Sequence, residues 1–157
     1  MKIKYLLLLV SLSCSISVAA QKASSDTIWD VLLNDIKIKH YYSTKYNGLM
    51  PRPKFGREVK ALNGQTITVR GFFLPIDVTN DMFVLSYNPM NMCFFCTGDG
   101  YQTILELNVL PKYLARFKKL KTDNYFEVRG KLRLNQNNYE HLFYILDDVE
   151  FIELIKQ

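Results

Sequence analysis

Cysteine is scarce in this chain, at three of 157 residues. So few cysteines exclude a fold held together mainly by disulfides. Glycine and proline are also infrequent, with seven and five residues, which excludes a collagen-like or low-complexity chain. Hydrophobic residues make up 48% of the sequence and charged residues 22%, as in a globular protein rather than a disordered one. The length suits a single domain.

Motifs of the common enzyme classes are missing. The sequence has no Walker loop, no glycine-rich dinucleotide turn, and no serine, histidine and aspartate in the spacing of a hydrolase triad. Four aspartates lie at the ends of expected strands, where this residue favours turns: Asp77, Asp81, Asp147 and Asp148. We therefore expect no catalytic residues and a non-enzymatic protein.

The only long apolar run lies within the first 20 residues. Two lysines precede a run from Tyr5 to Val18, and the small residues Ala19 and Ala20 follow it. This pattern is typical of a secretory signal peptide over residues 1–20, cleaved between Ala20 and Gln21. A membrane anchor is the alternative, but the run is short and interrupted by serines. We predict a periplasmic or secreted protein with no transmembrane segment after signal removal.

Positive charge exceeds negative charge only slightly. The full chain has a net charge of +5, and loss of residues 1–20 lowers it to about +3, because two lysines and no acidic residue are removed. So mild a balance does not indicate a nucleic-acid partner. The sequence contains one basic cluster, which comprises Lys112, Arg116, Lys118, Lys119 and Lys121. We interpret it as a solvated helix face rather than as a groove for single-stranded nucleic acid. An oligosaccharide or an anionic envelope component stays open as a partner.

Residues 21–61 precede the main predicted domain and fall into two parts. A helix is predicted from about Thr27 to Ile36, because apolar residues recur at four-residue intervals and Thr27 and Asp30 have capping-box spacing. Residues 37–60 contain three tyrosines, two prolines and seven cations, and the X-Pro steps argue against helix. We predict an extended segment that wraps the domain, with one strand near Lys39–Ser43.

Residues 62–157 have the alternation of β-strands. A short helix is predicted to begin at Pro111, between the third and fourth of five strands: Thr66–Leu74, Met82–Tyr87, Thr103–Val109, Asn124–Leu134 and His141–Leu154. Residues 67–71 resemble residues 126–130, and each segment ends in an inward-facing glycine that lets the strand coil. We predict a mainly β (α+β) fold: a small five-stranded barrel like the oligonucleotide/oligosaccharide-binding (OB) fold, with an N-terminal helix. An open sheet or a sandwich is the alternative.

The strongest chemical signal is a C-x-x-C pair, Cys93 and Cys96, in the loop between the second and third predicted strands. This spacing can place both sulfurs on one side of a turn. Three interpretations stay open: a local disulfide, a site for a soft transition metal, and a thiol–disulfide oxidoreductase. The last is the weakest, because such a pair normally opens a helix in a β-α-β setting. A c-type haem site is excluded, because Thr97 stands where a histidine is required.

A metal site would need ligands besides the two cysteines, because structural zinc takes four. Met92 is a soft donor beside the pair, Asp99 lies between the glycines that follow, and His40 in the wrapping segment can reach the loop. His141 begins the fifth strand, which we expect at the opposite end of the barrel from the loop. We predict zinc, or less readily copper, held by both cysteines and a third ligand from His40, Asp99 or Met92.

Residues 62–77, with the sequence LNGQTITVRGFFLPID, resemble the opening motif of an uncharacterised bacterial family of secreted proteins. Its members read L-x-G-x-x-V-x-I-x-G-F-x-x-P-I-D, followed by a cysteine-bearing segment and a short strand like residues 104–107. The resemblance covers about residues 27–152, although the chain lacks the proline-rich stretch that many members carry after the cysteine segment. It implies a small periplasmic β-barrel. Some relatives resemble accessory proteins of ABC-type metal-uptake systems, which implies a metal-related role beside an envelope transporter component.

Overall fold

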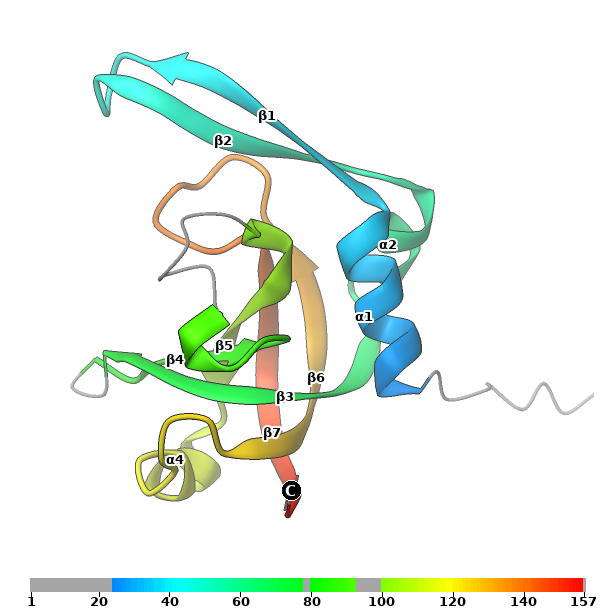
Figure 1. Cartoon of the computed structure of the whole chain (residues 1–157), viewed down its shortest axis with the longest axis vertical. Coiled ribbons are helices and arrows are strands. Elements are labelled where there is room, and N and C mark those ends of the chain that lie inside the picture. The colour runs from blue at the N-terminus through cyan, green and yellow to red at the C-terminus, as the bar shows by residue number, and fades with distance from the viewer. Residues whose placement is uncertain (1–23, 78–79, 93–99, 157) are drawn as a thin grey trace, which may run out of the picture.

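The computed structural model describes residues 24–77, 80–92 and 100–156. Figure 1 shows a barrel with one helix along its side and a two-stranded ribbon that projects beyond one end. The elements follow in the order α1 (Ser25–Asn34), β1 (Ile36–Ser43), β2 (Gly48–Phe55), α2 (Arg57–Leu62), β3 (Thr66–Asp77), β4 (Met82–Ser86), the 3₁₀ turns η1 (Met90–Met92) and η2 (Tyr101–Thr103), β5 (Ile104–Val109), α4 (Pro111–Phe117), β6 (Tyr125–Leu134) and β7 (Tyr144–Leu154).

Strands β3 to β7 form a closed barrel in the order β3-β4-β5-β7-β6. Neighbouring strands are antiparallel except for β5 and β7, which pair in parallel. Helix α4 lies between the third and fourth barrel strands and begins with Pro111 as its first residue. The predicted mainly β fold, an OB-like five-stranded barrel with two accompanying helices, is therefore confirmed.

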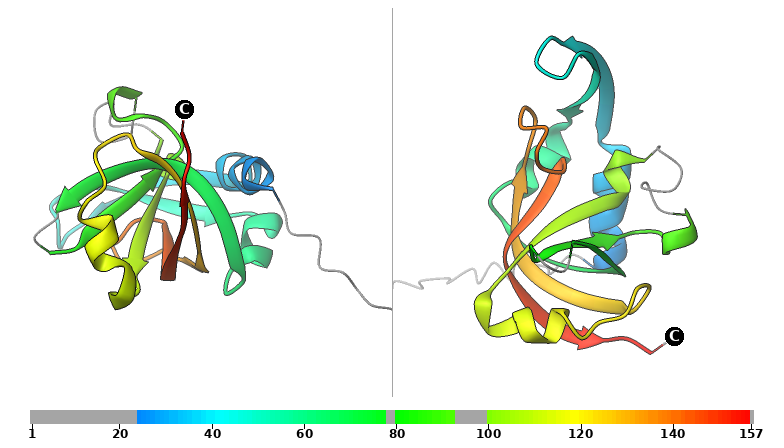
Figure 2. Two further views of the ribbon diagram at one scale, coloured as in Figure 1. Left: turned by 90° about the horizontal axis from the view of Figure 1, so that it is seen from below. Right: turned by 90° about the vertical axis from the view of Figure 1, so that its left-hand side faces the viewer.

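The barrel closes because β3 is long enough to pair along both of its edges. Its first part pairs with β6 from Thr66 to Phe72, and its second part pairs with β4 from Phe72 to Asp77. Figure 2 shows how strongly β3 curves between these partners. A Cβ atom at Gly71 would lie 2.6 Å from the main-chain oxygen of Ser86, so β4 can come this close only because residue 71 is glycine.

The hydrophobic core fills the barrel and continues under α1. Phe117 of α4 is completely buried, and its ring meets those of Phe73, Phe83 and other core aromatics at one end of the barrel. Long-range hydrogen bonds hold α1 in place, among them one from the amide of Arg70 to the Oγ of Ser25 at 2.8 Å. The indole Nε1 of Trp29 donates to the main-chain oxygen of Arg70 at 2.7 Å. The hydroxyl of Tyr144 donates to the main-chain oxygen of Leu32 at 2.8 Å.

The strand predicted near Lys39–Ser43 lies within β1, but the rest of residues 37–60 differs from the prediction. Instead of one strand in a wrapping segment, they form most of the antiparallel β1–β2 ribbon together with the start of α2. Pro51 and Pro53 argue against helix but not against a ribbon, whose outer edge requires no N–H donor. Asn47 takes a left-handed conformation with φ of 47° directly before Gly48, and Asn-Gly is a recognised hairpin signal.

Several predicted boundaries shift by a few residues. Helix α1 begins at Ser25 rather than Thr27, because the Oγ of Ser24 accepts a hydrogen bond from the amide of Thr27 at 3.2 Å and so caps the helix. Strand β7 begins at Tyr144, three residues after the predicted start, because residues 135–143 form a loop. Within the described ranges, no helix is long and apolar enough to cross a membrane.

Candidate functional site

Three predicted site residues, Cys93, Cys96 and Asp99, lie outside the described residues. The predictions of a metal site, a disulfide or a redox pair therefore stay predictions. In the part of the chain that the structure describes, no three His, Cys, Asp or Glu side chains are grouped so as to hold a metal ion.

The connection that carries the two cysteines is anchored on both sides of the undescribed segment. Before it, the amide of Met90 donates to Oδ1 of Asp123 at 2.7 Å. After it, the ring of Tyr101 stacks on that of Phe143, with centroids 5.2 Å apart. Tyr101, which follows the undescribed segment, therefore lies next to the loop that joins β6 and β7.

The two described candidates, Met92 and His40, lie on separate elements. Met92 is the last residue of η1, and 62% of it is exposed, so its thioether is accessible. His40 lies in β1 opposite Pro51 and is also exposed. Its strand belongs to the ribbon that stands beyond the barrel in Figures 1 and 2.

His141 occupies a different place from the one predicted. Because β5 and β7 run in parallel, both begin at the same end of the barrel. The cysteine connection leads into β5, and His141 lies three residues before β7. The expectation that His141 lies at the opposite end from this connection is therefore wrong. The stack of Tyr101 on Phe143, two residues after His141, joins the two segments directly.

One carboxylate holds His141 in a defined orientation. Its Nδ1 lies 2.7 Å from Oε1 of Glu106, and Oε2 of the same carboxylate accepts a hydrogen bond from the amide of Leu142 at 3.0 Å. The Glu106 side chain is only 12% exposed, whereas that of His141 is 41% exposed. A carboxylate on Nδ1 favours the tautomer that carries its proton there and leaves the lone pair of Nε2 free.

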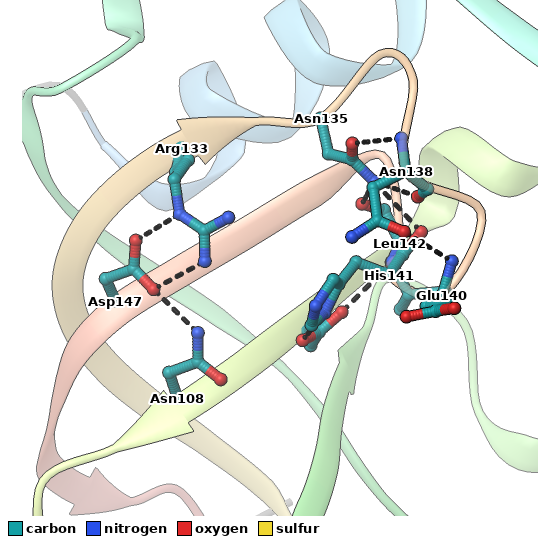
Figure 3. Close-up of polar contacts among 9 residues, drawn as sticks. Asn108, Arg133, Asn135, Asn138, Glu140, His141, Leu142 and Asp147 are labelled. Carbon is teal, nitrogen blue, oxygen red and sulfur yellow. Dashed lines mark hydrogen bonds and ion pairs between the residues drawn. The ribbon is translucent and has the colours of Figure 1, made fainter.

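The β6–β7 loop that carries His141 is held by a network around Asn135, shown in Figure 3. The side-chain amide of Asn135 donates to the main-chain oxygens of Asn138, His141 and Leu142 at 2.6, 3.1 and 3.1 Å. Its Oδ1 accepts from the amide of Asn138 at 3.0 Å. One side chain thus satisfies several main-chain groups of the loop and fixes its course.

A pocket of about 310 Å³ lies between this loop and the ribbon. Its apolar lining comes from the segment 49–51 of β2 and from the stacked rings of Tyr101 and Phe143, and its polar lining includes Asn135 and His141. This volume is at the lower end for sites that bind small ligands. The arrangement puts His141 at the wall of a part-apolar pocket beside the end of the cysteine connection.

A second polar cluster, also in Figure 3, lies farther along the barrel wall. Arg133 donates to the carboxylate of Asp147 through Nε at 2.6 Å and Nη2 at 3.0 Å, and Asn108 donates to it at 2.6 Å. The hydrogen bond from Arg133 is the main reason that the pKa of Asp147 lies below its ordinary value. A carboxylate so fully paired is suited to holding β5, β6 and β7 together rather than to accepting a proton in a reaction.

Neither Glu106 nor its pairing with His141 was predicted. In the sequence, Glu106 is one polar residue within an alternating strand, and its partner is 35 residues away. The signal that would have located the pair is the parallel alignment of β5 and β7, which places Glu106 opposite Ile145. Strand alternation alone does not reveal that alignment.

No protein-family model matches the chain, and no curated protein matches it.

Proposed function

We propose that the protein is an exported, non-enzymatic OB-like barrel that binds a soft transition metal, zinc in preference to copper, through Cys93 and Cys96. The observation that carries this proposal is the contact between His141 and Glu106 beside the end of the cysteine connection. Metal-binding histidines commonly hold a carboxylate on one ring nitrogen and the metal on the other. We therefore favour His141 over His40 as the third ligand, with Met92 or Asp99 as further donors.

This donor set suits the proposed metals. Two thiolates and a neutral imidazole are typical ligands of Zn²⁺, and thiolates with a thioether suit Cu⁺. Bound metal would also keep the two thiols from closing to a disulfide in an oxidising compartment. The residues of the chain would have three tasks: the cysteines bind, Glu106 orients the imidazole, and Asn135 holds the loop that carries it.

The proposed setting is the bacterial envelope. The signal-like residues 1–20 support export, and the resemblance to secreted proteins beside ABC-type uptake systems suggests a role in handing metal to a transporter component or in sensing it. Catalysis and nucleic-acid binding are not part of the proposal. A thiol–disulfide redox protein that uses the same pair is the less favoured alternative.

A binding module with a structural disulfide is the second candidate function. The pocket of about 310 Å³ between the ribbon and the β6–β7 loop favours it, because such a pocket can take a small ligand whether or not the cysteines bind metal. The two candidates differ in the state of Cys93 and Cys96, which can be measured directly.

Zinc titration of the reduced, exported protein tests the ligand assignment. Competition with a chromophoric chelator gives the zinc affinity of the wild type and of His141→Ala, His40→Ala and Glu106→Gln. We expect the affinity to fall by at least about tenfold for His141→Ala and by about tenfold for Glu106→Gln. The His40→Ala variant is the matched control and should bind as the wild type does.

Two results would contradict different parts of the proposal. Equal zinc affinity in His141→Ala and the wild type would remove His141 from the site but leave the cysteines as ligands. Failure of the reduced wild-type protein to bind zinc or Cu⁺ at all would overturn the metal function.

A further inference from the structure

A pocket of about 450 Å³ lies where the β1–β2 ribbon meets α2 and the β6–β7 loop. Figure 1 shows the ribbon crossing above this loop. The described residues that line the pocket include four cations and no carboxylate; the polar ones are Lys39, Tyr41, Arg52, Lys54, Lys60 and Gln136. We propose that this pocket binds a small ligand that carries two or more phosphate groups. This inference is independent of the metal proposal.

The register of the ribbon places like charges directly opposite each other. Lys39 pairs with Arg52, and Lys37 pairs with Lys54. Residues that alternate along a strand share a face, so these four cations form a block on one face of the ribbon. Like charges in direct cross-strand pairs destabilise a sheet, and an anion bound between them would remove that cost.

The described carboxylates do not balance the positive charge of the pocket. Across the described ranges, no carboxylate forms an ion pair with Lys39, Arg52, Lys54 or Lys60. The cations near α4 differ, because Lys112 pairs with Glu150 at 3.6 Å and Lys118 with Asp81 at 2.7 Å. The ribbon pocket therefore has free charge to offer to a ligand, whereas two of the lysines at α4 are already paired.

Contacts with the loop and with a ring hold part of this pocket in position. Arg52 donates through Nη2 to Oδ1 of Asn137, and its guanidinium lies over the ring of Tyr41, 5.8 Å from the centroid. Gln136 donates to the main-chain oxygen of Pro53 at 3.1 Å. These contacts leave other N–H groups of Arg52 available, and a guanidinium so oriented suits the paired oxygens of a phosphate.

Size and charge together define the class of ligand. A pocket of about 450 Å³ is large enough for a small organic ligand rather than a single ion. A phosphate monoester carries fewer than two negative charges near pH 7. The four cations that line the pocket therefore match the charge of at least two such groups. The phosphates could belong to a soluble compound or to a phospholipid head group, and both offer the same oxygens to the pocket.

Calorimetric titration of the exported protein with pyrophosphate tests the proposal. The variant Lys39→Gln/Lys54→Gln removes two cations of the pocket, and the control Lys119→Gln/Lys156→Gln removes the same charge from exposed positions elsewhere. We expect one pyrophosphate per chain, binding weakened at least about tenfold in the pocket variant, and no change in the control. Added salt should weaken binding to the wild type.

Thermal unfolding supplies a second readout that does not depend on calorimetric heat. Pyrophosphate should raise the unfolding temperature of the wild type and of the control by more than that of the pocket variant at the same concentration. Without ligand, the pocket variant should unfold no lower than the wild type, because it loses only like-charge repulsion. This comparison separates loss of the site from loss of the fold.

Sedimentation with vesicles distinguishes the two sources of phosphate. If vesicles that contain a phosphatidylinositol bisphosphate, whose head group carries two phosphate monoesters, carry down the wild type but not the pocket variant, the ligand is a head group. If pyrophosphate binds and the vesicles do not, the ligand is soluble. The proposal is overturned if pyrophosphate fails to bind, or if it binds the wild type, the pocket variant and the control equally.

Discussion

Gly71 is the direct cross-strand partner of Phe126 in the β3–β6 ladder, and Gly130 stands in the same relation to Ile67. The two segments with similar sequences, 67–71 and 126–130, thus pair with each other in opposite directions. A Cβ atom at Gly71 would meet the main-chain oxygen of Ser86 in β4, and one at Gly130 would meet that of Asp147 in β7. Each glycine therefore marks a point where a third strand approaches closely.

Substitution of Gly71 by alanine should destabilise the barrel. The added Cβ would lie 2.6 Å from the Ser86 oxygen, and overpacking of this kind costs about 1–3 kcal/mol. Gly48→Ala is the control, because its nearest neighbour would be 3.7 Å away and the expected change is within about 0.5 kcal/mol. Urea unfolding followed by circular dichroism measures both. Equal midpoints for the two variants would mean that β4 does not approach as closely as described.

Loss of the Tyr144 hydroxyl should loosen α1 from the barrel. This buried group donates to the main-chain oxygen of Leu32 at 2.8 Å, one of the carbonyls in the last turn of α1, which lack partners within a helix. We expect Tyr144→Phe to lower the free energy of unfolding by about 1–2 kcal/mol. The half-buried Tyr113 provides the control. Tyr113→Phe should leave the free energy of unfolding nearly unchanged. Hydrogen exchange in α1 should speed up only in Tyr144→Phe, and unchanged exchange there would contradict the role of this bond.

The contribution of Asp147 to stability should depend on pH. Hydrogen bonds from Arg133, and then from Asn108, lower the pKa of Asp147 from its ordinary value of 3.8. As the pH falls, Asp147 therefore takes up a proton in the unfolded chain at a higher pH than in the folded protein. The stabilisation by ionised Asp147 is complete above its ordinary pKa. It is lost as the pH falls through the lower pKa of the folded protein. At pH 7, Asp147→Asn should lower the free energy of unfolding by about 1 kcal/mol, since Arg133 is half exposed to solvent.

The neighbouring residue supplies the control for this experiment. Asp148 is exposed and has a φ of 55°, a conformation that asparagine also tolerates, so Asp148→Asn should unfold like the wild type at pH 7. The difference between wild type and Asp147→Asn should shrink below pH 4. A difference that stays constant from pH 7 down to pH 3 would show that the ion pair with Arg133 is not its source.

The barrel could be predicted from the sequence because its local signals agree with one another. Alternation gives the strands, Pro111 gives the start of α4, and the glycines at 71 and 130 mark the inner face where strands coil. The second strand of the ribbon was not predicted, because the X-Pro steps in residues 37–60 argue against helix without indicating a strand. The Asn47–Gly48 turn was its local signal.

The candidate site was predicted less well, for a physical reason. Which loops share an end of the barrel depends on how β5 and β7 align, and two strands separated along the chain carry no local mark of a parallel pairing. Strand order alone therefore places His141 at the wrong end of the barrel, and it does not indicate Glu106. Cys93, Cys96 and Asp99 lie outside the described residues, so their predicted roles stay predictions.

Metal and thiol content of the freshly isolated protein tests the metal function most directly. The protein is recovered without reductant or chelator, its metal is measured by elemental mass spectrometry, and its thiols are counted by alkylation. The proposal predicts one zinc or copper ion per chain and, after the metal is removed, free thiols at Cys93 and Cys96. A metal-free protein whose two cysteines are joined in a disulfide would contradict it.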